Sequence, residues 1–311
     1  MAILLAANFG ATERALWMHL LREALPGETI VDDRAACAPH AIDIAIVANP
    51  QTGALQGLPA LRFIQSLWAG VDRLLRDPTL PAGVPLARMV DPAMNEAMAE
   101  TALWAVLSLQ RGFFDYARQQ REQRWQQHPQ RRADEVKVAV LGLGQMGRTV
   151  ALRLAANGHR VGGWQRHAQP IVGIETHSGD AGLHALLPDA HVVVNLLPLT
   201  PATQGLCHAG TFAAMRRGAG FVNLARGAHV VEADLLRALD DGQLGHAVLD
   251  VFASEPLPAD HPFWSHPRVT VLPHVAAQTD ARSAAAVVAA NVRACRAGEP
   301  PAHLVDRARG Y

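Results

Sequence analysis

A glycine-rich turn, Gly142-Leu-Gly144-Gln-Met-Gly147, constrains the fold more than any other feature of this chain. It follows the apolar run Val138–Leu141 and opens a stretch with helical spacing that extends to Ala156. In such a turn the first glycine permits the tight bend, the second lets a pyrophosphate approach the backbone, and the third lets helix and strand pack closely. The helix N-terminus adds unpaired N–H groups and positive potential. The sequence therefore predicts a strand–turn–helix unit that binds a dinucleotide.

Short apolar runs alternate with helical stretches on both sides of this turn. The runs expected to form strands are Ile3–Ala6, Ile42–Val47, Arg62–Ser66, Val136–Leu141, Arg160–Trp164, His191–Leu196, Gly220–Leu224, His246–Val251 and Val269–Leu272. This alternation predicts parallel, doubly wound sheets. Residues 278–294 are alanine-rich and are expected to form a closing helix that returns to the first domain. We therefore expect an α/β fold of two Rossmann-like domains. A substrate domain of residues 1–95 and 277–311 is interrupted by a cofactor domain of residues 96–276.

The stretch of residues 96–125 contains no proline and a single glycine, Gly112. Its apolar residues recur close to helical spacing, as at Met98, Ala102 and Ala105. The pattern predicts one long helix at the domain junction. This helix is long and apolar enough to bury a face against a second subunit.

The overall charge and the cysteines exclude several classes of protein. Lys+Arg and Asp+Glu both number 28. The chain therefore lacks the basic excess that would indicate a nucleic-acid or membrane partner. No apolar stretch reaches the length of a membrane span. The three cysteines have no metal-ligand spacing and are expected to be free thiols in the cytoplasm. The fifteen histidines form no zinc-binding pattern, so no metal is expected.

The end of the strand after the glycine turn distinguishes between cofactors. An NAD site usually carries Asp or Glu about 20 residues beyond the turn, where it binds the ribose hydroxyls. Here the sequence is Trp164-Gln165-Arg166-His167, which has no carboxylate. An arginine can hold a 2′-phosphate by charge-assisted hydrogen bonds. We therefore predict NADP(H) in preference to NAD(H), the alternative being that Arg166 is a solvated loop residue.

Three polar residues follow later apolar runs: Arg226, Glu255 and His274. A fixed cation, a carboxylate and an imidazole would then meet at the ends of neighbouring strands. Downstream of a nucleotide turn, this set suggests hydride transfer to a carbonyl beside a carboxylate. Arg226 would polarise the carbonyl, and His274 would donate a proton to the forming alkoxide. Glu255 would favour the imidazolium and fix its tautomer.

Several motifs in this order resemble those of the D-isomer-specific 2-hydroxyacid dehydrogenases, and within them the glyoxylate/hydroxypyruvate reductase A type. They are the glycine turn, Asn195-Leu-Leu-Pro-Leu-Thr-Pro201, Asn223-Leu-Ala-Arg-Gly227, Asp250–Pro258 and Pro273-His274. The resemblance covers nearly the whole chain. It implies that Arg226 binds the substrate carbonyl and carboxylate, and that Glu255 pairs with the catalytic His274.

The resemblance also implies the remaining contacts. Expected cofactor-binding residues are Gly142, Gly144, Gln145, Met146, Gly147, Gln165, Arg166, Leu197, Pro198, Thr203, Leu224, Ala225, Arg226, Asp250, His274 and Ala276. Expected substrate-binding residues are Trp68, Ala69, Gly70, Arg226 and His274. The family usually has a small residue at the position of Trp68. A tryptophan there would either narrow the pocket and favour small acids or pack in the core.

These expectations combine into an NADPH-dependent enzyme that reduces glyoxylate and hydroxypyruvate to glycolate and D-glycerate. The resemblance also implies a homodimer. Two alternatives stay open. One is a reductase of a different or bulkier 2-oxo acid. The other is a catalytically weak scaffold that senses NADP(H), because related corepressors keep this fold.

Overall fold

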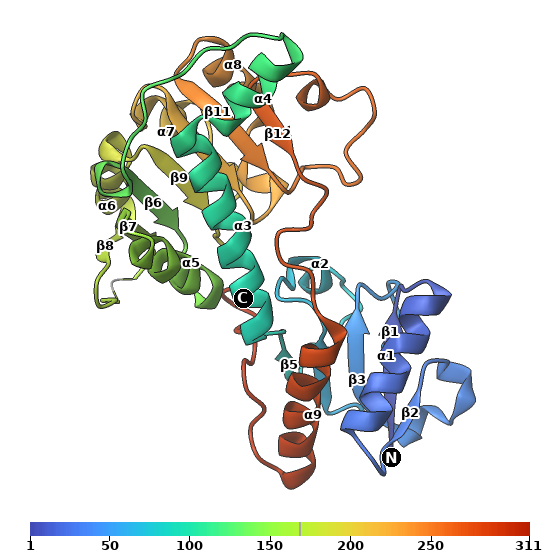
Figure 1. Ribbon diagram of the computed structural model, residues 1–311. Coiled ribbons are helices and arrows are strands. Elements are labelled where there is room, and N and C mark those ends of the chain that lie inside the picture. Colours follow the sequence, from blue (N-terminus) through green and yellow to red (C-terminus); the bar gives the residue numbers. More distant parts are fainter. Residues whose placement is uncertain (168) are drawn as a thin grey trace. The chain divides into compact units, whose positions relative to one another are not determined.

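The computed structural model describes residues 1–167 and 169–311 and divides them into two compact units. Unit 1 comprises Met1–Met94 and Thr279–Tyr311, and unit 2 comprises Asn95–Gln278. Unit 2 is thus inserted into a discontinuous unit 1 (Figure 1). Each unit is built around its own parallel sheet, so the predicted fold of two doubly wound domains is confirmed.

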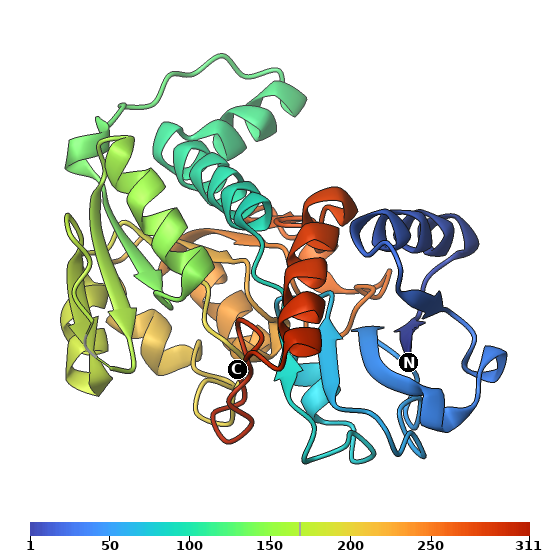
Figure 2. The same ribbon diagram turned by 90° about the horizontal axis from the view of Figure 1, so that it is seen from below.

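Unit 1 contains a five-stranded sheet in the order β2-β1-β3-β4-β5, with all neighbours parallel. Its elements are β1 (Ala2–Ala7), α1 (Ala11–Ala24), β2 (Thr29–Val31), β3 (Ile42–Ala48), β4 (Phe63–Ser66), α2 (Asp72–Leu75), β5 (Leu86–Ala87) and α9 (Ala281–Ala297). The central strand β3 is buried along its whole length, as expected of a strand covered on both faces. Helices α1 and α9 lie side by side in this unit (Figure 2).

Unit 2 contains a seven-stranded parallel sheet in the order β12-β11-β10-β9-β6-β7-β8. Its strands are β6 (Lys137–Leu141), β7 (Arg160–Gln165), β8 (Glu175–Ser178), β9 (Val192–Asn195), β10 (Ala219–Asn223), β11 (Leu244–Leu249) and β12 (Val269–Val271). The helices of this unit are α4 (Phe113–Arg121), α5 (Gln145–Ala156), α6 (Gly179–Leu186), α7 (Ala209–Ala214) and α8 (Glu232–Asp240), together with most of α3 (Pro92–Arg111). The strand order reverses between β6 and β9, the position at which doubly wound sheets bind their ligands.

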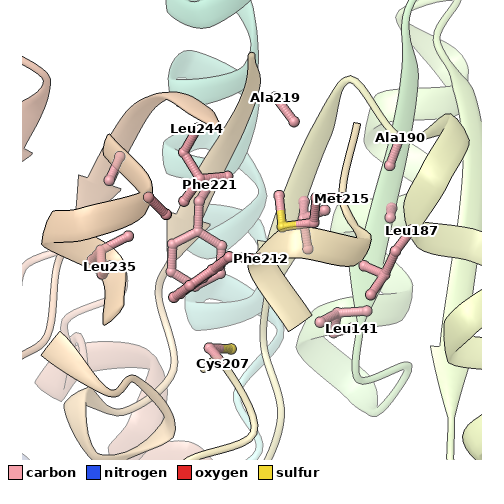
Figure 3. Packing of buried hydrophobic residues seen from close by; sticks show 14 of the residues in the cluster. Leu141, Leu187, Ala190, Cys207, Phe212, Met215, Ala219, Phe221, Leu235 and Leu244 are labelled. Atoms are coloured by element: carbon pink, nitrogen blue, oxygen red, sulfur yellow. The ribbon is translucent and has the colours of Figure 1, made fainter. Parts of the chain in front are cut away.

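Alternate residues of the strands pack on opposite faces of the unit 2 sheet. Val138 and Val140 of β6 join α3 and α5 on one face, whereas Ala139 and Leu141 join α6, α7 and α8 on the other. On this second face Phe212 of α7 meets Phe221 of β10 edge to face, with ring centroids 5.5 Å apart (Figure 3). Two fully covered faces leave only the strand ends for polar side chains, which explains why the motifs follow the strands.

Two sequence expectations need correction. The single helix predicted over residues 96–125 is two helices, α3 and α4, separated at Gly112. Gly112 adopts a left-handed conformation, with φ of 69°, which ends α3 and starts α4 in a new direction. The sequence also missed the strands β2, β5 and β8. They have three, two and four residues, too few for a periodic pattern, and β8 has no fully buried residue.

Candidate active site

The candidate site lies at the carboxyl ends of the unit 2 strands. The glycine turn follows β6, Arg226 follows β10, Asp250 and Glu255 follow β11, and His274 follows β12. Because β10, β11 and β12 are parallel neighbours, their carboxyl ends share one edge of the sheet. Residues far apart in the sequence therefore reach the same place.

His274 and Glu255 form a hydrogen-bonded ion pair. The Nδ1 atom of His274 lies 2.7 Å from Oε2 of Glu255. The other carboxylate oxygen, Oε1, accepts the backbone N–H of Phe252 at 2.9 Å, which fixes the orientation of the carboxylate. A carboxylate can only accept, so Nδ1 carries a proton. This leaves Nε2 as the ring nitrogen of His274 that is available to exchange a proton with a ligand.

The pair shifts the pKa values of both partners. The hydrogen bond to Glu255 raises the pKa of His274 above its ordinary 6.5, against the opposing effect of burial. Burial by itself would raise the pKa of Glu255, but hydrogen bonds from His274 and from the backbone of Phe252 outweigh it, so the pKa is lowered. The imidazolium–carboxylate form is therefore favoured, as a proton donor requires.

Asp250 holds the backbone around His274. Its side chain is 1% exposed. Its Oδ1 and Oδ2 accept the N–H groups of Val275 and Ala276 at 2.7 and 3.0 Å. Its backbone carbonyl accepts the N–H of His274 at 2.9 Å. His274 itself adopts a left-handed conformation with φ of 55°, which is rare for a residue other than glycine. Asp250 thus stabilises the strained turn that presents the imidazole.

Arg226 belongs to the same cluster of charges. The positive charge of Arg226 lowers the pKa values of both Glu255 and His274. Its guanidinium is partly buried and donates through Nη1 to the carbonyl of Ala225 at 2.7 Å. The next residue, Gly227, packs so closely on Phe252 that a Cβ atom would lie 1.8 Å from the carbonyl carbon of Phe252. The arginine turn and the Glu255 loop are therefore in direct contact.

The glycine turn has the shape that a dinucleotide requires. A Cβ atom on Gly142 would lie 2.7 Å from the carbonyl oxygen of Leu196, and φ of Gly142 is 95°. A Cβ on Gly147 would lie 1.7 Å from the carbonyl oxygen of Gly142. Around Gly144, in contrast, the space within 4 Å of a Cβ is empty. Gly144 precedes α5, so an anion can approach its backbone from the open side.

The other expected cofactor residues occupy the neighbouring strand ends. Gln145 and Met146 begin α5, and Gln165 ends β7. Arg166 follows β7 as an exposed residue and makes no hydrogen bond or ion pair within residues 1–167 and 169–311. Leu197, Pro198 and Thr203 lie in the loop after β9, where the Thr203 hydroxyl donates to the Pro198 carbonyl at 2.7 Å. Leu224 and Ala225 are buried after β10, and Ala276 is buried after β12.

The expected substrate loop, Trp68–Gly70, belongs to unit 1 and follows β4. The Ser66 hydroxyl braces it by accepting the Trp68 N–H at 3.0 Å and donating to the Trp68 carbonyl at 3.1 Å. The Trp68 ring meets Phe9 edge to face, with centroids 6.1 Å apart. Its buried indole N–H has no hydrogen-bond acceptor among the described residues. Trp68 therefore packs against Phe9 and carries a donor that no group of the described residues satisfies.

A cavity of about 290 Å³ in unit 2 lies away from these residues. It opens at the amino ends of the strands, where Val136, His191, Gly220 and His246 line it together with Phe114 of α4. None of the candidate site residues contributes to its walls.

In the described part of the chain, no group of three or more His, Cys, Asp or Glu side chains has the arrangement of a metal site. All three cysteines are free, and burial raises the pKa of Cys207 to about 12. No helix in residues 1–167 or 169–311 is long and apolar enough to cross a membrane.

Sequence reasoning named two asparagines at this edge only as the first residues of motifs and assigned no role to them or to a buried histidine beside them. Asn195, Asn223 and His229 are each 0% exposed and lie beneath the loops that carry the expected cofactor and substrate residues. The two asparagines end the apolar strands β9 and β10. A polar residue that ends a buried strand is the signal that marks them, but His229 has no such signal because its burial depends on the tertiary fold.

Comparison with known sequences finds matches to one family of enzymes. Residues 103–276 match the family described as "D-isomer specific 2-hydroxyacid dehydrogenase, NAD binding domain". A protein of Serratia proteamaculans (strain 568) named glyoxylate/hydroxypyruvate reductase A is 41% identical over 305 residues, which cover 95% of this chain and 96% of that protein. A protein of the same name from Yersinia enterocolitica is 40% identical over 304 residues, covering 96% and 97% of the two chains.

Solved structures agree with the sequence matches. A D-isomer specific 2-hydroxyacid dehydrogenase from Xanthobacter autotrophicus Py2, in complex with NADPH and MES, superposes with a TM-score of 0.95 at 38% identity, covering 100% of this chain and 99% of that one. An NADPH-dependent glyoxylate/hydroxypyruvate reductase from Sinorhizobium meliloti, in complex with NADP and sulfate, superposes with a TM-score of 0.93 at 36% identity and the same coverage.

Proposed function

Because the chain belongs to the D-isomer specific 2-hydroxyacid dehydrogenase family, we propose that it reduces the small 2-oxo acids glyoxylate and hydroxypyruvate to glycolate and D-glycerate with NADPH. The observation that carries this proposal is the 2.7 Å contact between His274 Nδ1 and Glu255 Oε2, which leaves Nε2 as the proton donor. The names of the Serratia and Sinorhizobium relatives support the choice of substrates.

The proposed reaction develops negative charge on the carbonyl oxygen. Arg226 keeps its charge at any working pH, forks onto the carboxylate and carbonyl oxygens of the substrate, and stabilises that charge. His274 donates the Nε2 proton to the same oxygen. Glu255 stays ionised and stabilises the imidazolium before transfer. In the reverse direction, neutral His274 accepts the hydroxyl proton.

The cofactor would be held by residues of the same sheet edge, and when bound it supplies the hydride to the carbonyl carbon. The open backbone at Gly144 and the N-terminus of α5 suit its pyrophosphate. Arg166 suits a 2′-phosphate because it is exposed at the end of β7 and no acidic residue of β7 accompanies it. The complexes of two relatives with NADPH and NADP support the same preference.

Steady-state kinetics test the proposal directly. Glyoxylate, hydroxypyruvate, pyruvate and phenylpyruvate are compared with NADPH and with NADH. We expect the highest kcat/KM for the two smaller substrates with NADPH. A preference for phenylpyruvate would favour a bulkier 2-oxo acid instead. Tight NADPH binding with no turnover of any acid would favour a nucleotide-sensing scaffold.

We further propose a cytoplasmic homodimer that forms through the α3–α4 region. Three large apolar side chains of this region are exposed: Trp104 at 42%, Phe113 at 52% and Trp125 at 95%. Burial of such side chains between subunits would remove apolar surface from water. The free cysteines suit a reducing compartment. Size-exclusion chromatography with light scattering at micromolar concentration would give a monomer mass if the dimer proposal is wrong.

A further inference from the structure

Three buried polar side chains connect two loops of the candidate site. Asn195 ends β9, Asn223 ends β10, and His229 ends the short 3₁₀ turn Gly227–His229. The Asn195 amide donates through Nδ2 to Oδ1 of Asn223 at 3.0 Å. The same Nδ2 lies 3.1 Å from Nδ1 of His229. A polar group buried this completely is costly unless its hydrogen bonds are made, so the arrangement is strongly specified.

The two asparagines bind the backbone of the loops that follow their strands. Oδ1 of Asn195 accepts the N–H of Leu197 at 3.2 Å, at the start of the expected cofactor loop. Oδ1 of Asn223 accepts the N–H of Ala225 at 3.2 Å, and its Nδ2 donates to the carbonyl of Arg226 at 3.0 Å. Asn223 therefore encloses the turn from which the Arg226 side chain projects.

The hydrogen bonds determine the tautomer of His229. The N–H of Leu197 can only donate, so the Asn195 atom that faces it is the amide oxygen, and the atom that faces His229 is the amide nitrogen. Nδ1 of His229 must then be an acceptor, and Nε2 carries the proton of the neutral ring. Nε2 lies 3.3 Å from the Pro198 carbonyl, which is an acceptor. One neutral tautomer satisfies both contacts.

We propose that His229 is a positioning residue that couples the cofactor loop to the substrate arginine. Its Nε2–H holds the loop at Pro198. Its Nδ1 orients Asn195, and Asn195 orients Asn223 against the backbone of Arg226. This inference rests on the proposed function, because it assigns a purpose to the placement of Arg226. The ring is 0% exposed, so it acts through Arg226 and not on the substrate.

Two variants separate the hydrogen bonds of His229 from its volume. The amide oxygen and nitrogen of glutamine have nearly the spacing of the two ring nitrogens, so His229→Gln keeps both contacts. His229→Leu fills the space but removes both. Small displacements of catalytic groups cost up to about a hundredfold in rate. We expect His229→Leu to lower kcat/KM for glyoxylate about tenfold to a hundredfold and to weaken NADPH binding, and His229→Gln to stay within about threefold of wild type.

Combination with Arg226→Lys shows whether His229 acts through Arg226. Residues that act as one unit give non-additive losses. We expect His229→Leu to cost much less in the Arg226→Lys background than in wild type. Equal losses in both backgrounds would mean a merely structural role and would overturn the inference. A folded His229→Gln variant with more than about a tenfold loss would also overturn it, and this outcome remains measurable if His229→Leu does not fold.

The wild-type enzyme is assayed first with glyoxylate, hydroxypyruvate and NADPH. The absence of turnover would overturn the proposed function, and the inference would fall with it. If the wild-type enzyme turns over these substrates and His229→Leu has the same kcat/KM, the inference is overturned and the proposed function stands. Melting temperatures and NADPH dissociation constants of all variants are measured in the same series, so that a loss of folding is not read as a loss of positioning.

Discussion

The two sheets of this protein share a parallel, doubly wound construction but place a buried carboxylate at opposite edges. In unit 1, Asp43 is the second residue of β3, at its amino end, and is 0% exposed. Its Oδ2 accepts hydrogen bonds from Arg62 at 3.0 Å and from Arg296. In unit 2, Asp250 follows β11 at its carboxyl end and accepts backbone N–H groups.

The difference shows how one fold serves two purposes. The arginines around Asp43 are neutralised by it and by Glu28, so this cluster fixes α9 to the sheet of unit 1. At the carboxyl edge of unit 2, backbone N–H groups satisfy Asp250, and Arg226 at the same edge is the residue proposed to bind the substrate. Substitutions in the first cluster should therefore change stability, whereas substitutions at the second edge should change kinetics.

The largest expected effect is that of Arg226→Ala. Loss of one donor to a developing oxyanion costs about 10²–10³ in kcat, and Arg226 is also proposed to bind the substrate carboxylate. We expect kcat/KM for glyoxylate to fall at least about 10³-fold while the melting temperature changes little. Arg237→Ala is the matched control because Arg237 is 74% exposed on α8. A loss below about tenfold in Arg226→Ala would contradict the proposed mechanism.

Asp43→Ala should have the converse effect. Asp43 is buried, but its partners Arg62 and Arg296 are partly exposed, so its removal should cost about 1.5–3 kcal/mol, the range for hydrogen bonds to charged groups. Chemical denaturation should show this loss in the free energy of unfolding, with kcat for glyoxylate unchanged. Asp134→Ala serves as the control, since Asp134 and Arg132 form a surface pair with side chains 62% and 75% exposed. Unchanged stability in Asp43→Ala would show that the cluster does not hold unit 1 together.

Arg166→Asp tests the cofactor end of the unit 2 edge. Each charge-assisted hydrogen bond to a phosphate contributes about 1.5–3 kcal/mol. The ratio of kcat/KM with NADPH to that with NADH should therefore fall about tenfold to a hundredfold. Arg160→Asp makes the same charge change at the opposite end of β7 and should leave the ratio unchanged. A variant that kept its NADPH preference would remove Arg166 from the site.

Glu255→Gln should change the pH profile. The pKa of His274 is raised by Glu255, so reduction persists above pH 6.5 and is lost as the pH rises through this raised pKa. Without the carboxylate the pKa falls, and the loss of kcat begins at a lower pH. The variant should therefore be more impaired at about pH 8 than at about pH 6. Glu232→Gln is the control because Glu232 faces His261. If kcat of Glu255→Gln and of wild type fell over the same pH range, the assignment of His274 as the acid would be contradicted.

Local patterns accounted for most of the fold. The apolar runs located the central strands because a strand buried on both faces needs an unbroken apolar run. The turn at Gly142 was recognisable because Gly142 and Gly147 stand where a Cβ atom would collide with the backbone. The break at Gly112 was not, because a single glycine is compatible with both a continuous helix and a left-handed end.

The sequence by itself determined the alternation of elements, the glycine turn and which side chains follow the strands, because these depend on neighbours along the chain. Only the tertiary structure decided that Glu255 meets His274 through Nδ1, that Asp250 holds the turn of His274, and that His229 lies buried between two loops. These contacts join segments that follow different strands, and packing on both faces of the sheet sets the register of those strands. No local sequence pattern fixes that register, so no local pattern predicts these hydrogen bonds.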